Sequence, residues 1–153
     1  MNINQILTPE RTFCHAPASS KKRALEIVAD FLSSNNPNID STELFENLTA
    51  RERLGSTGIG MGVAIPHCRY NKIEQTQACL VKLKQPVDFD AIDNQPVDIL
   101  FVLIVPEDAH DEHLQTLAEL ARLLSQTEYR NQLRKSQTSE ELFQAAVHFE
   151  KAA

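Results

Sequence analysis

The most apolar stretch of the chain is residues 97–105, which read VDILFVLIV. The stretch has the length of a strand, is rich in β-branched side chains and is followed by Pro106. A nearly continuous apolar run of this length is typical of a central strand that is covered on both faces. We therefore predict that residues 97–105 form the middle of a sheet.

Other segments place apolar residues at the three- and four-residue spacing of amphipathic helices. Residues that favour the N-cap position precede three of them, namely Ser20, Asp40 and Thr138. Asp40 and Thr138 are each followed three residues later by a glutamate, as in a capping box. The helices predicted from these signals span residues 20–34, the segment from Asp40 to Gly55, residues 109–126, residues 128–134, and a last segment that begins after Thr138.

Two further segments have the composition of strands. Residues 12–16 could form an edge strand, and residues 78–83 read as a strand that Pro86 closes. No internal repeat, low-complexity tract or interdomain linker is visible, and a chain of 153 residues is large enough for one good core. Helices that alternate with a few strands predict a single α/β domain with both sheet faces covered.

All the glycines of the chain, four in number, lie within the eight residues from Gly55 to Gly62. Glycine allows positive φ angles and the close approach of a backbone to a ligand. We therefore expect a loop with several tight turns. A short apolar segment and the triplet Ile-Pro-His follow, and they predict a short strand that delivers the imidazole of His67. Backbone amides of such a loop could hold an anion beside that imidazole.

Composition and charge narrow the classes of function. The net charge of −6 and the pI near 5.3 argue against general binding to nucleic acid or to anionic membranes, which needs a basic face. No apolar run approaches the roughly 20 residues of a membrane span, and residues 1–10 do not resemble a signal peptide. Three cysteines without a pattern suggest reduced thiols, so we expect a cytoplasmic protein.

Residues 55–67, reading GSTGIGMGVAIPH, carry a resemblance to a known family. They resemble the active-site loop of the IIA proteins of the bacterial phosphoenolpyruvate-dependent phosphotransferase system. The nitrogen regulatory branch, which is close to the fructose/mannitol-type IIA domains, is the most similar. The resemblance extends over nearly the whole chain and includes residues 89–98 (FDAIDNQPVD) and 113–117 (HLQTL). Met61 and Cys68 depart from the family pattern, in which a small polar residue and a glycine are common.

The resemblance implies one IIA type-2 domain over residues 1–153, with a mixed, mostly buried sheet flanked by helices on both faces. It implies that His67 carries the phosphoryl group on Nε2, and that His113 hydrogen-bonds the phosphoryl oxygens without being phosphorylated. It assigns Arg51 as the cation, because a guanidinium forks onto such oxygens. Arg53 is a rival for that role. On a helix the two arginines point about 200° apart, so we expect only one to reach the site.

Four residues of the loop are further candidates for binding the phosphoryl group. Ser56 and Thr57 could donate hydroxyl hydrogen bonds, although residues of this type form turns and caps just as readily. Gly60 and Gly62 would let backbone amides come close to the group.

The sequence gives no support for a metal or another cofactor, and we expect none. Adjacent cysteine and histidine residues at 14–15 and 67–68 lack the CxxC or HxxxH spacing of zinc sites. A pair formed by His110 and His113 lacks a third ligand, so we expect His110 at the surface. The aspartates within residues 88–98 are expected to form turns and caps.

The expected function is that of a phosphotransferase component with a covalent phosphohistidine. His67 would accept the group from an HPr-like phosphocarrier, and the phosphorylation state would regulate partners in nitrogen and potassium metabolism. The alternatives are a sugar-type IIA component that passes phosphate to a IIB domain, and a non-catalytic binding module of the same fold. A chain without an attached IIB domain favours the regulatory role. A histidine-dependent hydrolase ranks lowest, since no nucleophile elbow is present, and the lack of a Walker loop argues against ATP as donor.

Overall fold

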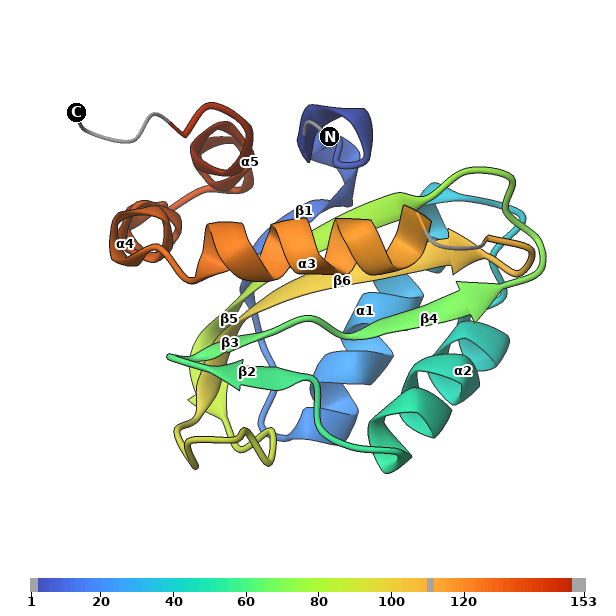
Figure 1. The fold of residues 1–153 in the computed structure, drawn as a ribbon, viewed down its shortest axis with the longest axis horizontal. Coiled ribbons are helices and arrows are strands. Elements are labelled where there is room, and N and C mark those ends of the chain that lie inside the picture. Colours follow the sequence, from blue (N-terminus) through green and yellow to red (C-terminus); the bar gives the residue numbers. More distant parts are fainter. Residues whose placement is uncertain (1–2, 110–111, 150–153) are drawn as a thin grey trace.

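The computed structural model describes residues 3–109 and 112–149. In this part of the chain one mixed sheet has the strand order β1-β5-β6-β3-β2, and β4 also pairs with β6 (Figure 1). β1 is parallel to β5, β5 is antiparallel to β6, and both β3 and β4 are parallel to β6. The strands are β1 (Thr12–Ala16), β2 (Gly58–Gly60), β3 (Val63–Ala64), β4 (His67–Tyr70), β5 (Gln77–Val87) and β6 (Val97–Pro106).

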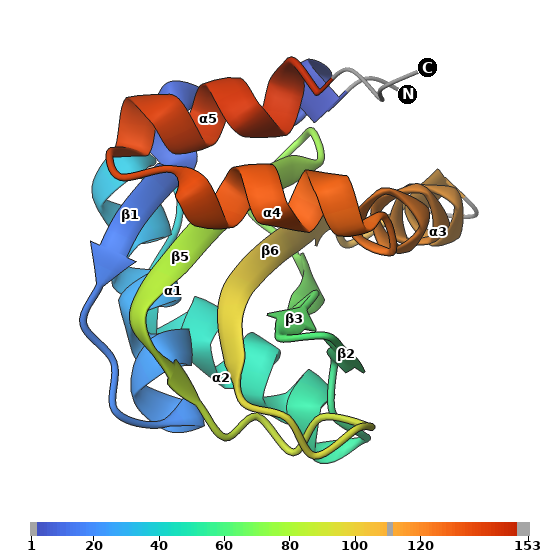
Figure 2. The same ribbon diagram turned by 90° about the vertical axis from the view of Figure 1, so that its left-hand side faces the viewer.

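Helices cover both faces of this sheet, as Figures 1 and 2 show. The helices α1 and α2 pack on one face, and α3, α4 and α5 pack on the other. The predicted α/β fold is therefore confirmed. Within the described residues no helix combines the length and the apolar character that a membrane span requires. The helices are α1 (Lys21–Asn35), α2 (Ser41–Arg53), α3 (Glu112–Leu124), α4 (Thr127–Lys135) and α5 (Ser139–Val147), preceded by the 3₁₀ turns η1 (Ile3–Gln5) and η2 (Pro9–Arg11).

The central strand of the sheet is β6, as the apolar run predicted. Successive side chains of a strand point to opposite faces, and those of β6 alternate between two separate apolar cores. Because both faces are buried, the strand needs apolar residues at nearly every position. Leu100, Val102 and Ile104 enter the core under α1 and α2, and Ile99, Phe101, Leu103 and Val105 enter the core under α3, α4 and α5.

The predicted helix caps are present in the structure. The side chains of Ser20, Asp40 and Thr138 each accept a hydrogen bond from the backbone N–H three residues later, at 3.0–3.1 Å. These bonds satisfy donors that the first turn of a helix leaves without partners. The helix predicted over residues 109–126 is shorter at both ends, and Ala109 instead closes a turn by donating to the carbonyl of Pro106.

The strand predicted at residues 78–83 is longer than expected. β5 continues to Val87, so the prediction that Pro86 closes it is wrong. The pairing with β6 shifts register between Lys82 and Val87. A proline is tolerated in such an irregular stretch, because no regular ladder there requires its missing N–H. The edge strand predicted at residues 12–16 is confirmed as β1.

The glycine-rich segment is more regular than the predicted loop, since it contains a β-hairpin. β2 and β3 are antiparallel, and Gly60 is paired with Val63. The two residues between them, Met61 and Gly62, have φ angles of 58° and 79°. Two central residues with positive φ define a type I′ turn, which suits the twist of a hairpin. At Met61 this conformation costs about 1–2 kcal/mol relative to the right-handed region.

Candidate active site

His67 lies at an edge of the sheet, where a strand is interrupted. β3 and β4 both run parallel to β6 in one continuous register, with Val63 opposite Ile99 and His67 opposite Leu103. Pro66 separates them, because it has no N–H to give to a ladder. The carbonyl of Pro66 still accepts a hydrogen bond from the N–H of Leu103 at 2.9 Å. The interruption therefore leaves the register intact and puts His67 at the first position of β4.

The two ring nitrogens of His67 have different partners. Nδ1 lies 2.7 Å from the carbonyl oxygen of Ile65, and Nε2 accepts a hydrogen bond from Nε of Arg51 at 3.2 Å. A carbonyl oxygen only accepts, so Nδ1 must carry the proton. A guanidinium only donates, so Nε2 must carry the lone pair. The surroundings thus select the tautomer in which Nε2 is the nucleophilic atom.

The environment of His67 favours its neutral form. Burial lowers the pKa of His67 below its ordinary value. The charge of Arg51 lowers this pKa further, while the hydrogen bond with the Ile65 carbonyl acts in the opposite direction. A neutral imidazole with a directed lone pair can attack an electrophile such as phosphorus.

Arg51 and His113 reach His67 from opposite faces of the sheet. Arg51 lies in the last turn of α2, and its Nη1 donates to the carbonyl of Gly55 at 2.8 Å. His113 lies in the first turn of α3, and its ring centroid is 6.4 Å from that of His67. Both helices reach the imidazole because, in the part of the chain that the structure describes, no strand pairs with the outer side of β4. The structure therefore brings together the three residues predicted to be catalytic.

Of the two arginines considered for the cation, Arg51 is the one that contacts His67. Arg53 is exposed, whereas Arg51 is half-buried and donates to the His67 ring. The other histidine considered in the sequence, His110, lies outside the described residues.

The hydroxyl groups of Ser56 and Thr57 have partners within the loop. Ser56 Oγ donates to the carbonyl of Phe89 at 2.6 Å and accepts from the N–H of Gly58 at 3.0 Å. Thr57 is buried, and its Oγ1 donates to a carboxylate oxygen of Glu52 at 2.5 Å. These bonds shape the loop, and the phosphoryl-binding role of the two residues stays a prediction.

Gly60 and Gly62 lie where a side chain would meet neighbours other than the His67 imidazole. A β-carbon at Gly60 would lie 3.3 Å from the carboxylate of Asp93, and one at Gly62 would collide with the guanidinium of Arg134. Arg134 in turn forms an ion pair of 3.0 Å with Asp98. The two glycines thus allow the hairpin to pack closely, and their role in phosphoryl binding also stays a prediction.

Sequence reasoning missed one functional candidate, Glu52. Its side chain is only 5% exposed, and it accepts hydrogen bonds from the N–H and the hydroxyl of Thr57. It also forms an ion pair of 3.0 Å with Lys21, which comes from α1. In the sequence, a glutamate between two arginines at the end of a helix looks like an exposed charge, so nothing there indicates that its side chain is buried. Its contacts fix the start of the loop directly beside Arg51.

Two of the aspartates within residues 88–98 have the turn role that was expected, whereas Asp98 lies in β6 and pairs with Arg134 instead. Asp88 and Asp93 accept backbone hydrogen bonds from Asp90 and Gln95, which is typical of turns. The hydrogen bonds that Asp93 accepts lower its pKa, first of all the one from the N–H of Met61.

Metal ligation finds no support in the described residues. Among them no group of three or more histidine, cysteine, aspartate or glutamate side chains could hold an ion. Cys14, Cys68 and Cys79 are free thiols. Burial raises the pKa of Cys68 to about 12, so it remains a protonated thiol packed against the core under α1 and α2.

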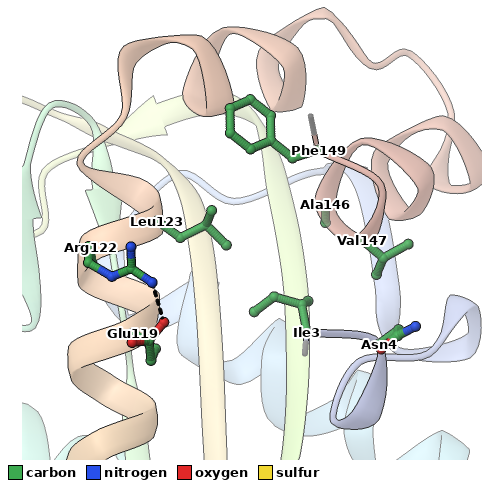
Figure 3. Close-up of a pocket in the computed structure, with 8 residues that line it drawn as sticks. All are labelled: Ile3, Asn4, Glu119, Arg122, Leu123, Ala146, Val147 and Phe149. Carbon is green, nitrogen blue, oxygen red and sulfur yellow. Dashed lines mark hydrogen bonds and ion pairs between the residues drawn. The ribbon is translucent and has the colours of Figure 1, made fainter. Parts of the chain in front are cut away.

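A surface cavity of about 300 Å³ lies elsewhere, between η1, α3 and the end of α5 (Figure 3). Its wall carries an ion pair of 2.6 Å between Glu119 and Arg122, and its lining includes Ile3 and Phe149. None of the three catalytic candidates lines it. The cavity therefore belongs to a different part of the molecule from the His67 site.

Comparison with known proteins identifies the family. Residues 5–147 match the model of the family described as "Phosphoenolpyruvate-dependent sugar phosphotransferase system, EIIA 2". A nitrogen regulatory protein of Pseudomonas aeruginosa is 47% identical over 147 residues, which cover 96% of each chain. The crystal structure of nitrogen regulatory protein IIA-Ntr from Neisseria meningitidis has a TM-score of 0.86 at 38% identity, over 94% of this chain and 98% of that one.

A more distant structure shares the fold. It is a chain in the complex of enzyme IIAMTL and phosphorylated enzyme IIBMTL from Escherichia coli, with a TM-score of 0.77 at 16% identity. The match covers 94% of this chain and 100% of that chain. Together with the motif around His67, these matches show that the chain belongs to the EIIA 2 family of the phosphoenolpyruvate-dependent sugar phosphotransferase system, alongside relatives named nitrogen regulatory proteins.

Proposed function

We propose that the protein is a cytoplasmic phosphoryl carrier whose His67 accepts a phosphoryl group on Nε2 from an HPr-like phosphocarrier. The observation that carries the proposal is the pair of hydrogen bonds on the His67 ring. Ile65 holds the proton on Nδ1, and Arg51 faces the lone pair on Nε2. A cation that already sits at the nucleophilic nitrogen is well placed for a group that arrives with negative charge.

The transfer is a displacement at phosphorus. The lone pair of His67 Nε2 forms a new N–P bond while the N–P bond of the donor phosphohistidine breaks, and the donor nitrogen keeps the electron pair. Positive charge then builds on the His67 ring, and the hydrogen bond from Nδ1 to the Ile65 carbonyl stabilises it.

Arg51 must change partner during this step. Its Nε–H now points at the lone pair that performs the attack, so the guanidinium has to move onto the oxygens of the incoming group. A guanidinium matches two such oxygens at once, and it lowers the cost of the charge that spreads over them. His113, on the opposite side of the ring, is in position to donate to a further oxygen.

The output of the carrier is its phosphorylation state, read by partner proteins in nitrogen and potassium regulation. The likeness to nitrogen regulatory proteins at 38–47% identity supports this role. A sugar-type role, in which the group passes on to a IIB domain, is the second candidate. The name of the family favours it, as does the shared fold with enzyme IIAMTL, which was solved with its IIB partner.

The test is to incubate the protein with phosphoenolpyruvate, enzyme I and a phosphocarrier of either the nitrogen or the sugar branch. Intact-mass spectrometry should find one acid-labile phosphoryl group on the wild type and on His148→Gln, which changes an exposed histidine at the end of α5. His67→Gln should gain none. A wild type that gains none with either donor chain would refute the proposal and favour the non-catalytic binding module. Discharge of the group to an added fructose- or mannitol-type IIB domain would favour the sugar role.

A further inference from the structure

Arg69 projects from the same face of β4 as His67. Residues two apart in a strand share a face, and the intervening Cys68 packs into the opposite core, under α1 and α2. Arg69 is exposed and lies on the side of the sheet that α3 covers. It therefore borders the site without belonging to the apolar core.

The guanidinium of Arg69 is fixed to the connection between β6 and α3. Its Nη1 donates to the carbonyl of Glu107 at 3.2 Å and also to the carbonyl of Ala109. Figure 1 shows the ends of β4 and β6 and the start of α3 at the same side of the molecule. Charge-assisted bonds of this kind are stronger than neutral ones, so Arg69 ties β4 to this connection.

The first half of α3 contributes less to the apolar core than its second half. Among the α3 side chains that the structure describes, Leu120 and Leu124 in the second half are buried, whereas Leu114 in the first turn is 61% exposed. His113 lies in this first turn and is half-buried. Helix α3 begins at Glu112, three residues after Ala109, and such a link spans at most about 11 Å. The position of Ala109 therefore limits where His113 can lie.

We propose that Arg69 is a positioning residue for phosphoryl transfer, which holds residues 107–109 so that His113 meets the group on His67. The proposal rests on the proposed function. Arg69 acts through His113 and does not itself take part in the chemistry. The consequence is specific: the benefit of Arg69 to the reaction exists only while His113 is present.

The test is a double-mutant cycle on the rate of phosphoryl transfer from the phosphocarrier. Arg69→Gln should slow transfer by about 10- to 100-fold, the cost of misplacing a group by roughly 1 Å. In a His113→Ala background the same change should cost less than about twofold, because the two residues act as one unit. Arg69→Lys, which keeps a donor, should recover part of the rate.

Lys72→Gln is the matched control. Lys72 lies just beyond β4 and pairs with Glu43 at 3.1 Å, so this change removes the same charge near the same edge. It should leave the rate within about twofold of wild type, as expected for a surface ion pair. An equal loss from Arg69→Gln with and without His113 would overturn the proposal, as would no loss at all.

A second measurement does not depend on phosphorylation. In imidazole-selective NMR spectra, Arg69→Gln should move the ring resonances of His113, and Lys72→Gln should not. Unchanged His113 resonances in Arg69→Gln would overturn the proposal, even if the wild type accepted no phosphoryl group. A wild type that is phosphorylated while Arg69→Gln keeps its full rate would refute the role of Arg69 alone.

Discussion

Replacing Glu52 by alanine should destabilise the protein by about 3 kcal/mol. The Glu52 carboxylate is almost fully buried and has three donors. The N–H and the hydroxyl of Thr57 donate at 3.1 and 2.5 Å, and the ammonium of Lys21 lies at 3.0 Å. The substitution would leave the buried donors of Thr57 without an acceptor and would remove the nearest counter-charge of Lys21.

The magnitude follows from these contacts. Breaking a buried ion pair by removing one partner costs about 3–5 kcal/mol. The Lys21 side chain is 20% exposed and has a second carboxylate, Asp90, at 3.8 Å. We therefore expect the loss of stability to lie at the lower end of this range. Glu52→Gln keeps an amide oxygen for the N–H of Thr57 and loses mainly the charge, so we expect a smaller cost of about 1–2 kcal/mol.

Urea unfolding at neutral pH measures the effect as a difference in the free energy of unfolding, provided that the m value is unchanged. Glu46→Ala is the matched control, because Glu46 lies in the same helix but is exposed, and it should cost less than about 0.5 kcal/mol. A Glu52→Ala protein within about 1 kcal/mol of wild type would refute the view that this carboxylate anchors the loop.

Two further predictions concern His67 and Gly62. Lowering the pH from about 7.5 to about 5.5 should destabilise the wild type relative to His67→Gln in urea unfolding, because the unfolded chain gains a proton that the folded state resists. Burial lowers the folded pKa of His67 below 6.5, so stability is lost as the pH falls; equal pH slopes would contradict this. Gly62→Ala should cost about 1–3 kcal/mol, because its φ is 79° and its β-carbon would collide with Arg134. Gly55→Ala has open space at the β-carbon, but the φ of 153° at this position also strains an alanine, so it should cost a comparable amount by the same assay; a Gly62→Ala protein as stable as wild type would contradict the argument.

Local signals in the sequence account for most of the fold. The helix caps and the buried strand β6 depend on neighbouring residues, so the sequence predicts them directly. The hairpin of β2 and β3 was missed because its strands have only three and two residues. Its turn also carries Met61 where asparagine, aspartate or glycine is usual. Contacts with Asp93 and Arg134 hold this turn, and both are distant in the sequence.

The residues of the active site, like the elements of the fold, could be predicted only in part from the sequence. The motif around His67 predicted that Arg51 and His113 would join it, and the structure places all three together. The supporting residues Glu52 and Arg69 could not be found, because each acts through tertiary contacts. A glutamate on a helix and an arginine on an edge strand both read as solvated charges until their partners are known.

The measurement that tests the central claim most directly is the position of the phosphoryl group on the ring. The protein, labelled with ¹⁵N in its histidines and phosphorylated by its donor chain, is studied by ¹⁵N and ³¹P NMR. The hydrogen bond between Nδ1 of His67 and the Ile65 carbonyl predicts that phosphorus is bonded to Nε2 and that Nδ1 keeps its proton. A phosphoryl group on Nδ1, or on a residue other than His67, would contradict the account.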